Sequence, residues 1–213
     1  MSARQTAALP SRRSESSRRA ILDAALALCR EEGYARLSIE AIAARAGAGK
    51  QTIYRWWPSK GAVLLEALER EAAVTAAYPD TGDLVADLRT TLTEVVGLLA
   101  SPDFGPLLAA LIAEAQQDPA LGRLLLERFI NPRRAPIAAR LRRAQQAGQL
   151  PETLDADGVL EVIFGALYHR LLLPSGMLDA AYANFVLDTV VGTSAVRPNI
   201  SDQGATPTAR APA

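Results

Sequence analysis

The residues from Lys50 to Lys60 carry side chains whose chemistry suits the recognition of a polyanion. They supply cationic groups for phosphate, amide and hydroxyl groups for base edges, and aromatic rings between them. They belong to a longer segment, residues 37–60, that reads LSIEAIAARAGAGKQTIYRWWPSK. This combination predicts a DNA-reading element, and the residues before it must form the element that positions it.

The segment reads as two short helices joined by a turn. Ser38 is a good N-cap for the first helix, because its hydroxyl can accept a hydrogen bond from a first-turn amide. Gly47 stands where the chain must reverse and tolerates a positive φ there. The second helix extends from about Gly49 to Trp57 and ends before Pro58, which cannot continue it. The predicted buried stripe of the first helix is Ile39, Ile42, Ala43 and Ala46.

The two faces of the second helix differ in character. Ile53 and Trp57 share one face and are expected to point inward. The opposite face is polar and basic, and it consists of Gln51, Thr52, Tyr54 and Arg55. This arrangement predicts a helix-turn-helix whose second helix reads DNA.

Three side chains of the second helix are candidates for reading base edges. Gln51 suits adenine, Arg55 suits guanine, and the methyl group of Thr52 suits thymine. Lys60 lies in the first turn of the next helix, where a cation is unfavourable unless a phosphate lies beside it. Tyr54 offers its phenol to phosphate or caps the small core, and both can hold. The complete set of predicted DNA contacts is Ser38, Lys50, Gln51, Thr52, Tyr54, Arg55, Trp56 and Lys60.

The remaining basic and aromatic residues of this region have less specific roles. Lys50 is a candidate for phosphate or guanine. Trp57 is expected in the core, while Trp56 is expected to flank the DNA face. The N-terminal arginines add minor-groove or backbone contacts, or else form a solvated basic arm; they are Arg12, Arg13, Arg18 and Arg19.

The distribution of charge agrees with a DNA-binding front half. The net charge is zero, but residues 1–70 carry 12 Lys+Arg against 7 Asp+Glu, and the remainder carries 11 against 16. A basic front and an acidic rear indicate that only the front meets a polyanion. The single cysteine, Cys29, excludes an internal disulfide and is predicted to be a buried, inert thiol. With no secretory signal and no apolar run of the roughly 20 residues that span a bilayer, we expect a cytoplasmic protein without membrane contact.

The sequence contains no complete motif for catalysis or for phosphate binding by a glycine-rich loop. The sequence from Ala46 to Thr52 resembles a phosphate-binding loop, but position 44 is Ala instead of Gly and Gln51 follows Lys50. His169 is the only histidine, so neither a hydrolase triad nor a histidine-based metal site can form. We therefore expect no enzymatic activity, no cofactor and no metal.

Every element between the two ends of the chain is predicted to be helical. The first helix covers about Glu15 to Glu32, with Ile21, Ala25, Leu28 and Cys29 inward, and Ser59 caps a fourth helix that reaches about Ala77. The rear helices are expected at about 83–100, 102–117, 119–147, 155–173 and 178–192, the third being kinked or split near Asn131 by Pro132 and Pro136. The prediction is an all-α fold of about nine helices, with a disordered arm at 1–13, a helix-turn-helix domain at 14–77, a helical effector and dimerisation domain at 78–193, and a disordered tail at 194–213.

These motifs resemble the TetR/AcrR family of transcriptional regulators. The residues that carry the resemblance form an ordered set over about 50 positions: 21–25, 33–34, 37–38, 42–43, 46–47, 52–54 and 59–60. Beyond Tyr78 the resemblance is one of architecture only. It implies a repressor that binds a near-palindromic double-stranded DNA operator as a homodimer and is released by a small molecule. Many members carry His-Phe or Tyr-Phe where this chain has Trp56-Trp57, so the operator need not match a relative's.

The two last helices are apolar on more than one side, which predicts burial against a partner subunit. The predicted dimer contacts are Leu160, Phe164, Leu167, Tyr182, Phe185 and Thr189.

An effector cavity is expected in the same half, lined by Phe104, Leu108, Phe129, Phe164, Tyr168 and His169, with an unknown apolar or aromatic ligand. Two other functions stay open: a DNA-binding regulator controlled by a protein partner or by no ligand, and a helical interaction protein that no longer binds DNA.

Overall fold

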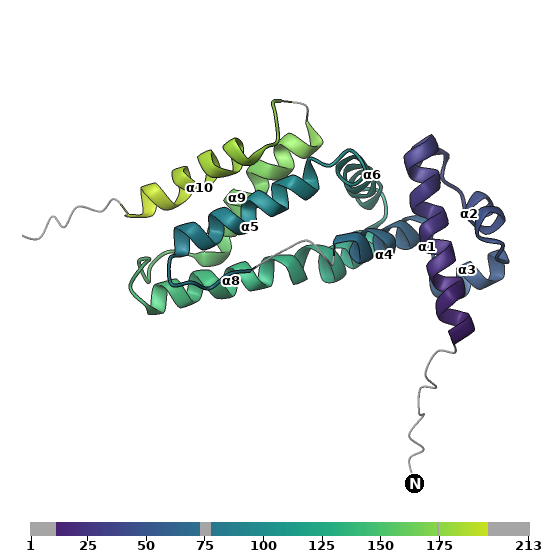
Figure 1. The fold of residues 1–213 in the computed structure, drawn as a ribbon, viewed down its shortest axis with the longest axis horizontal. Coiled ribbons are helices and arrows are strands. Elements are labelled where there is room, and N and C mark those ends of the chain that lie inside the picture. The colour runs from purple at the N-terminus through teal and green to yellow at the C-terminus, as the bar shows by residue number, and fades with distance from the viewer. Residues whose placement is uncertain (1–11, 73–77, 174, 196–213) are drawn as a thin grey trace, which may run out of the picture.

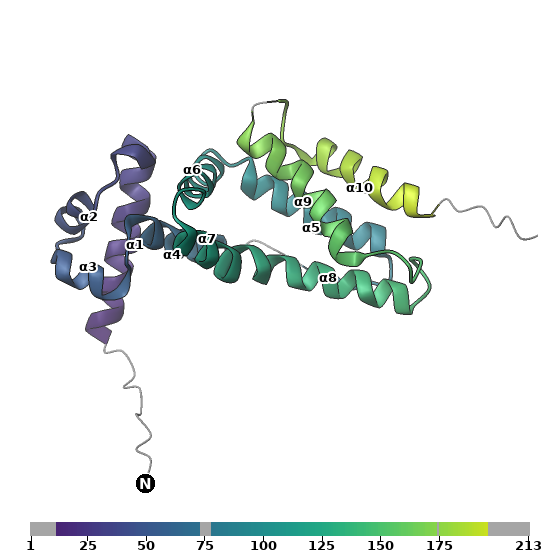
Figure 2. The same cartoon turned by 180° about the vertical axis from the view of Figure 1, so that it is seen from behind.

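The computed structural model describes residues 12–72, 78–173 and 175–195, and these are arranged as helices joined by turns (Figure 1). No strand occurs in this part of the chain, so the predicted all-α fold is confirmed. A small helical unit lies at one end, and a longer bundle extends away from it. Figure 2, seen from behind, shows the same separation, with α4 joining the two parts.

The front unit contains α1 (Arg12–Glu32), a 3-10 turn (Tyr34–Arg36), α2 (Ile39–Ala46), α3 (Lys50–Trp56) and α4 (Lys60–Ala72). Helix α1 packs against α2 and α4. The inward residues predicted for α1 are all buried, and so is Cys29, whose burial raises its pKa to about 11. The prediction of a buried thiol is therefore confirmed. The core of this unit consists of Ile21, Ile42, Ile53, Trp57, Leu64, Leu65 and Leu68.

The rear bundle contains α5 (Leu84–Leu99), α6 (Gly105–Ala115), α7 (Pro119–Leu125), α8 (Asn131–Gln146), α9 (Ala156–Leu172) and α10 (Ala180–Ala195). Helix α10 packs on α5 and α9, and α8 packs on α5 and α9. Helices α6 and α7 contact α4, so they form the end of the rear bundle that faces the front unit. The buried apolar side chains of both parts form one continuous cluster, which makes α4 a structural connection.

The long helix predicted over 119–147 is divided by a π-helical turn, Leu126–Ile130. Pro132 lies in the first turn of α8 and Pro136 lies inside it, and neither has an amide hydrogen for the helical ladder. The chain therefore stays helical but changes its winding just before Asn131, where the split was expected. Turns of this kind occur frequently at functional sites.

Some predictions on the ends of elements fall outside the described residues. These are the end of the fourth helix at residues 73–77 and most of the two terminal segments. Helix α1 begins at Arg12 and α10 extends to Ala195, so each is slightly longer than predicted. No helix of the described chain has both the length and the apolar character needed to cross a membrane.

Candidate DNA-binding face and effector cavity

The helix pair α2–α3 is fixed by local caps. The Ser38 hydroxyl accepts a hydrogen bond from the amide of Ala41 at 3.1 Å, which holds the first turn of α2. Gly47 ends α2 with φ 61°, the left-handed conformation that glycine adopts without strain. The amide of Ala48 then donates to the carbonyl of Ala43 at 3.0 Å and closes the turn. These bonds set the angle at which α3 leaves α2.

Helix α3 presents the predicted polar face to solvent. Ile53 and Trp57 are fully buried, so the opposite side of this short helix must face outward. Exposed on it are Lys50, Gln51, Tyr54 and Arg55, while Thr52 and Trp56 are half-buried. The Arg55 guanidinium lies 5.3 Å from the centre of the Trp56 ring, and Trp56 meets Trp57 edge to face at 5.4 Å. The fold thus brings the predicted reading residues onto one surface.

Lys50 already has a partner within the chain. Its ammonium donates to a carboxylate oxygen of Glu40 at 2.7 Å, across the turn between α2 and α3. This hydrogen bond raises the pKa of Lys50 and lowers that of Glu40. Both side chains are exposed, so the pair is weak and a phosphate can replace the carboxylate.

Lys60 is positioned by a residue to which the sequence assigned no role. Its ammonium lies 4.5 Å from the centre of the Tyr34 ring and 3.5 Å from the Tyr34 carbonyl oxygen. Ser59 caps α4 by accepting from the amide of Ala62 at 3.2 Å, so Lys60 stands at the positive end of this helix. The described carboxylates form no ion pair with Lys60, and its positive charge stays available to an anion. The Gly33-Tyr34 pair, one of the matches that carry the family resemblance, is the feature of the sequence from which this contact could have been predicted.

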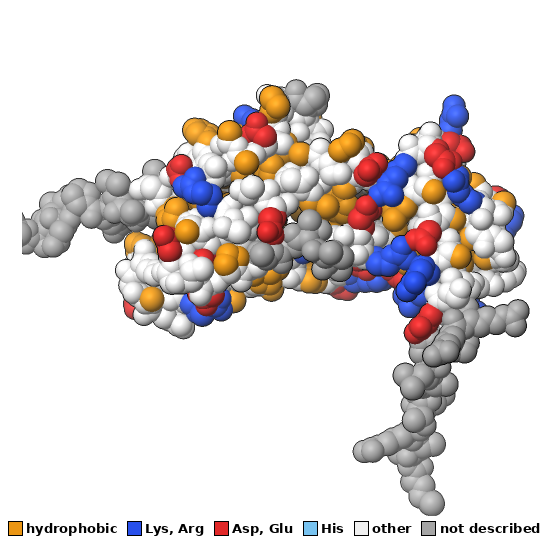
Figure 3. Space-filling view, viewed as in Figure 1, with side chains coloured by type: hydrophobic (Ala, Val, Ile, Leu, Met, Phe, Trp, Pro, Cys, Tyr) orange, Lys and Arg blue, Asp and Glu red, His pale blue; other side chains and the backbone are white. Residues whose placement is uncertain are grey.

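The C-terminal end of α3 is anchored to both halves of the protein through Glu66 of α4. The Glu66 carboxylate accepts from Trp57 Nε1 at 3.0 Å and from Arg18 of α1 at 2.6 Å. It also accepts at 3.5 Å from Arg128, which lies in the π-helical turn and donates to Glu69 at 2.6 Å. Arg18 is therefore tied to α4 and is not part of the basic arm expected from the sequence. Figure 3 shows the Lys and Arg side chains near α1 and α4 interspersed with Asp and Glu.

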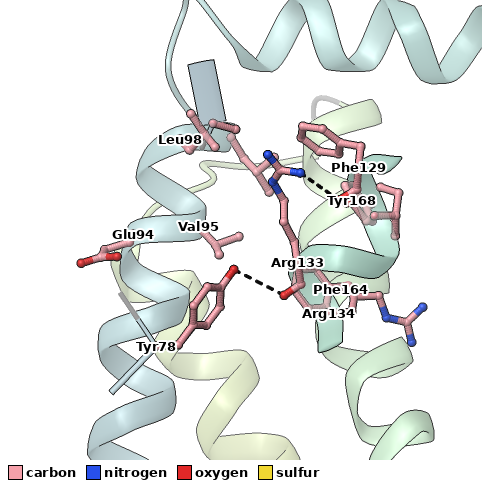
Figure 4. A pocket seen from close by; sticks show the side chains of 12 residues that line it. Tyr78, Glu94, Val95, Leu98, Phe129, Arg133, Arg134, Phe164 and Tyr168 are labelled. Carbon is pink, nitrogen blue, oxygen red and sulfur yellow. Dashed lines mark hydrogen bonds between the residues drawn. The ribbon is translucent and has the colours of Figure 1, made fainter. Parts of the chain in front are cut away.

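An apolar cavity of about 40 Å³ lies where the C-terminal end of α4 meets α5, α8 and α9 (Figure 4). Three of the six predicted effector residues line it: Phe129, Phe164 and Tyr168. The other three do not. Phe104 and Leu108 are fully buried in packing between helices, and His169 is exposed on the opposite side of α9. The remaining lining residues are Ala72, Tyr78, Glu94, Val95, Leu98, Leu99, Ile130, Arg133 and Arg134.

Arg133 is a polar residue of this cavity to which the sequence analysis gave no role. Its guanidinium carbon lies 3.8 Å from the centre of the Phe129 ring, and Nη1 donates to the Phe129 carbonyl oxygen at 3.0 Å. Burial lowers the pKa of Arg133. Burial also raises the pKa of Tyr168 to about 12, so this phenol is neutral at physiological pH. No periodicity distinguishes Arg133 from the other arginines of α8, and only the packing places it here.

The predicted dimer residues divide into two groups. Leu160, Phe164 and Leu167 are buried within the single chain, so they cannot form the surface of an interface and this part of the prediction is wrong. They face inward because α9 packs on α6, α8 and α10, which use its most apolar stripe. Phe185 is 64% exposed and Thr189 is exposed next to it on α10, while Tyr182 is half-buried. The exposed face of α9 instead carries Val162, Gly165, His169 and Leu172.

A capped helix-turn-helix with an exposed basic reading helix, joined to a helical bundle with its own cavity, defines a DNA-binding regulator with a separate regulatory half. Two family models agree with this class. Residues 21–67 match the "Bacterial regulatory proteins, tetR family" model, and residues 78–190 match the "Tetracyclin repressor-like, C-terminal domain" model. The chain belongs to the TetR family of transcriptional regulators, which are not enzymes.

Similar proteins extend over most of the chain. An uncharacterized HTH-type transcriptional regulator, YdeS from Bacillus subtilis, is 33% identical over 86% of this chain and 92% of its own. The DNA-binding transcriptional repressor TetR of Mycobacteroides abscessus is 32% identical over 84% of this chain and 94% of its own. The crystal structure of the TetR family regulator SCO0332 has a TM-score of 0.71 and 35% identity, and covers 86% of this chain and all of its own.

Proposed function

We propose that this regulator is a dimeric repressor that leaves its operator when a small molecule enters the cavity. The observation that carries the proposal is the position of the cavity against Ala72 at the end of α4, the helix that begins at Lys60 on the DNA-binding face. A ligand that enlarges the cavity pushes on α4. In a dimer, two reading helices engage successive major grooves when they stand about 34–36 Å apart, so a tilt of α4 changes that spacing.

A second route from the cavity to α3 supports the same switch. Phe129 lines the cavity, and the preceding residue, Arg128, reaches Glu66 and Glu69 of α4. Glu66 in turn holds the Trp57 indole at the C-cap of the reading helix. The π-helical turn is therefore in contact with both the cavity and the anchor of α3.

The DNA contacts follow from the exposed face of α3 and the start of α4. Lys60 and Tyr54 bind phosphate, and Gln51 and Arg55 read base edges. The dimer forms through the exposed faces of α9 and α10 around Val162 and Phe185, because large apolar side chains there have no cover within the described chain. A near-palindromic operator follows from the two-fold symmetry of such a dimer.

The DNA face is tested by binding measurements on duplexes selected from random sequence. Lys60→Ala should weaken binding to specific and random duplexes equally, because phosphate carries no sequence information. Gln51→Ala should instead relax the preference at particular base pairs, by roughly 1–3 kcal/mol. Arg89→Ala, which removes an exposed cation paired with Asp188 in the rear bundle, is the control for charge and should do neither. Unchanged affinity and preference in both test variants would contradict this docking of α3.

The switch is tested by linkage. A 100-fold loss of operator affinity requires about 2.7 kcal/mol of coupling, and operator DNA must weaken ligand binding by the same factor. The small cavity favours one other candidate, a regulator without a ligand, since about 40 Å³ has room for only a few water molecules. Equal ligand affinities with and without operator would refute ligand-driven release and favour a regulator controlled by a protein partner or by no ligand.

A further inference from the structure

Of the two arginines that line the cavity, Arg133 and Arg134, only Arg133 directs its guanidinium into it in Figure 4. Glu66 and Glu69, the acidic residues of α4 near the cavity, are bound by Arg18 and Arg128. Among the described residues, no carboxylate forms an ion pair with Arg133. Its hydrogen bonds go to backbone carbonyls, a short one to Phe129 and a long one of 3.5 Å to Glu69. The cavity wall therefore carries a positive charge that forms no ion pair with any described carboxylate.

This charge lies in apolar surroundings. The Arg133 guanidinium rests on the Phe129 ring, and Figure 4 shows it pointing towards Leu98 on the opposite wall. A half-buried cation is costly unless an anion or several hydrogen bonds compensate it. The planar guanidinium of arginine binds a carboxylate in a bidentate geometry, and such a carboxylate supplies both the negative charge and two hydrogen bonds.

The neighbouring residues favour an aromatic ligand. Glu94 is the one carboxylate that lines the cavity, and Figure 4 shows it directed away from Arg133. The Phe164 and Tyr168 rings lie 6.2 Å apart at a tilt of 33°, and with Phe129 they provide the apolar wall. Tyr168 is uncharged, so it does not repel an anion. Since the present volume is about 40 Å³, a small flat ring requires the least enlargement of the cavity.

We infer that the effector of this regulator is an aromatic monocarboxylate whose carboxylate binds Arg133 and whose ring lies against Phe129, Phe164 and Tyr168. The inference rests on the proposed ligand-responsive function and names the chemical class of the effector. The carboxylate competes for the donor that now holds the Phe129 carbonyl in the π-helical turn, so binding acts on the segment that carries Arg128.

The test is calorimetric titration of the full chain with benzoate and 1-naphthoate, and with benzamide and 1-naphthamide as uncharged counterparts. We expect saturable binding of at least one acid, with its amide at least about 10-fold weaker, because only the acid makes the charge-assisted bidentate contact. Arg133→Leu should remove the preference for the acid. Arg142→Leu is the matched control, since this arginine of the same helix pairs with Asp157 and does not line the cavity, and it should change binding less than about 2-fold.

Three results would overturn the inference: equal binding of acids and amides, an undiminished preference in Arg133→Leu, or no saturable binding of either acid up to about 10 mM. If Arg133→Leu fails to fold, Arg133→Lys serves in its place and should show a reduced preference, because lysine keeps the charge but lacks the fork. Operator binding is measured separately. Operator binding without acid binding refutes the ligand class alone, whereas acid binding that leaves operator affinity unchanged refutes the proposed switch.

Discussion

Replacement of Glu66 should show how strongly the reading helix depends on one carboxylate of α4. The Glu66 side chain is 12% exposed and accepts from the indole of Trp57, which is 1% exposed. Burial acts to raise the pKa of Glu66, but the hydrogen bonds from Arg18 and Trp57 outweigh it, and the pKa lies below its usual value. The carboxylate is therefore ionised at neutral pH and bound on several sides.

The expected magnitude follows from the exposure of each partner. In Glu66→Leu the buried Trp57 donor loses its acceptor, which costs about 1–3 kcal/mol. The side chains of Arg18 and Arg128 are 50% and 39% exposed, so each lost ion pair adds less than about 1 kcal/mol. The sum is about 1–5 kcal/mol. Glu66→Gln keeps an acceptor for the indole and should cost only about 1 kcal/mol.

The assay is urea unfolding at a fixed protein concentration, because the proposed dimerisation would make the apparent stability depend on concentration. Arg128→Met, which removes the ion pairs of Arg128 with Glu66 and Glu69 but keeps the Trp57 hydrogen bond, is the control and should lose less than about 1 kcal/mol for each pair. Equal losses in Glu66→Gln and Glu66→Leu would show that the indole hydrogen bond is unimportant. A loss below about 1 kcal/mol in Glu66→Leu would refute the reasoning as a whole.

Three further predictions concern the fold and the interface. Arg140→Met should cost about 3–5 kcal/mol in urea unfolding, because it leaves Asp87, 2% exposed, without its cation at 2.8 Å. Hydrogen bonds from Thr81 and Arg140 outweigh burial and lower the pKa of Asp87. The ionised Asp87 therefore stabilises the fold above about pH 4, and this stabilisation is lost as the pH falls below that. The difference in unfolding free energy between Arg140→Met and the parent protein should become smaller in acid, and a difference that stays constant would contradict this. Phe185→Lys should yield monomers with an unchanged helical circular-dichroism spectrum, and a dimer that persists in sedimentation would exclude this face of α10. Gly47→Ala should destabilise the protein by about 1 kcal/mol, because alanine is strained at φ 61°, and an unchanged urea midpoint would contradict this.

The sequence by itself determined the helix-turn-helix and its outward face. Ser38, Gly47 and Ser59 act through bonds within a few residues, so their roles follow from residue type and position alone. Ile53 and Trp57 share one side of a short helix, which leaves a single orientation for Gln51 and Arg55.

Only the tertiary structure decided how the rear half divides its apolar residues between core, cavity and outer surface. Leu160 and Leu167 lie on a stripe that periodicity cannot assign to a neighbouring helix or to a partner subunit, and the packing of α9 against three helices of its own chain made them core. Arg133 and Arg134 both line the cavity, but Figure 4 shows the Arg134 guanidinium directed away from it, although the two are adjacent and identical in type. The positions of both depend on helices distant in sequence, and the pattern of a single helix contains no information about them.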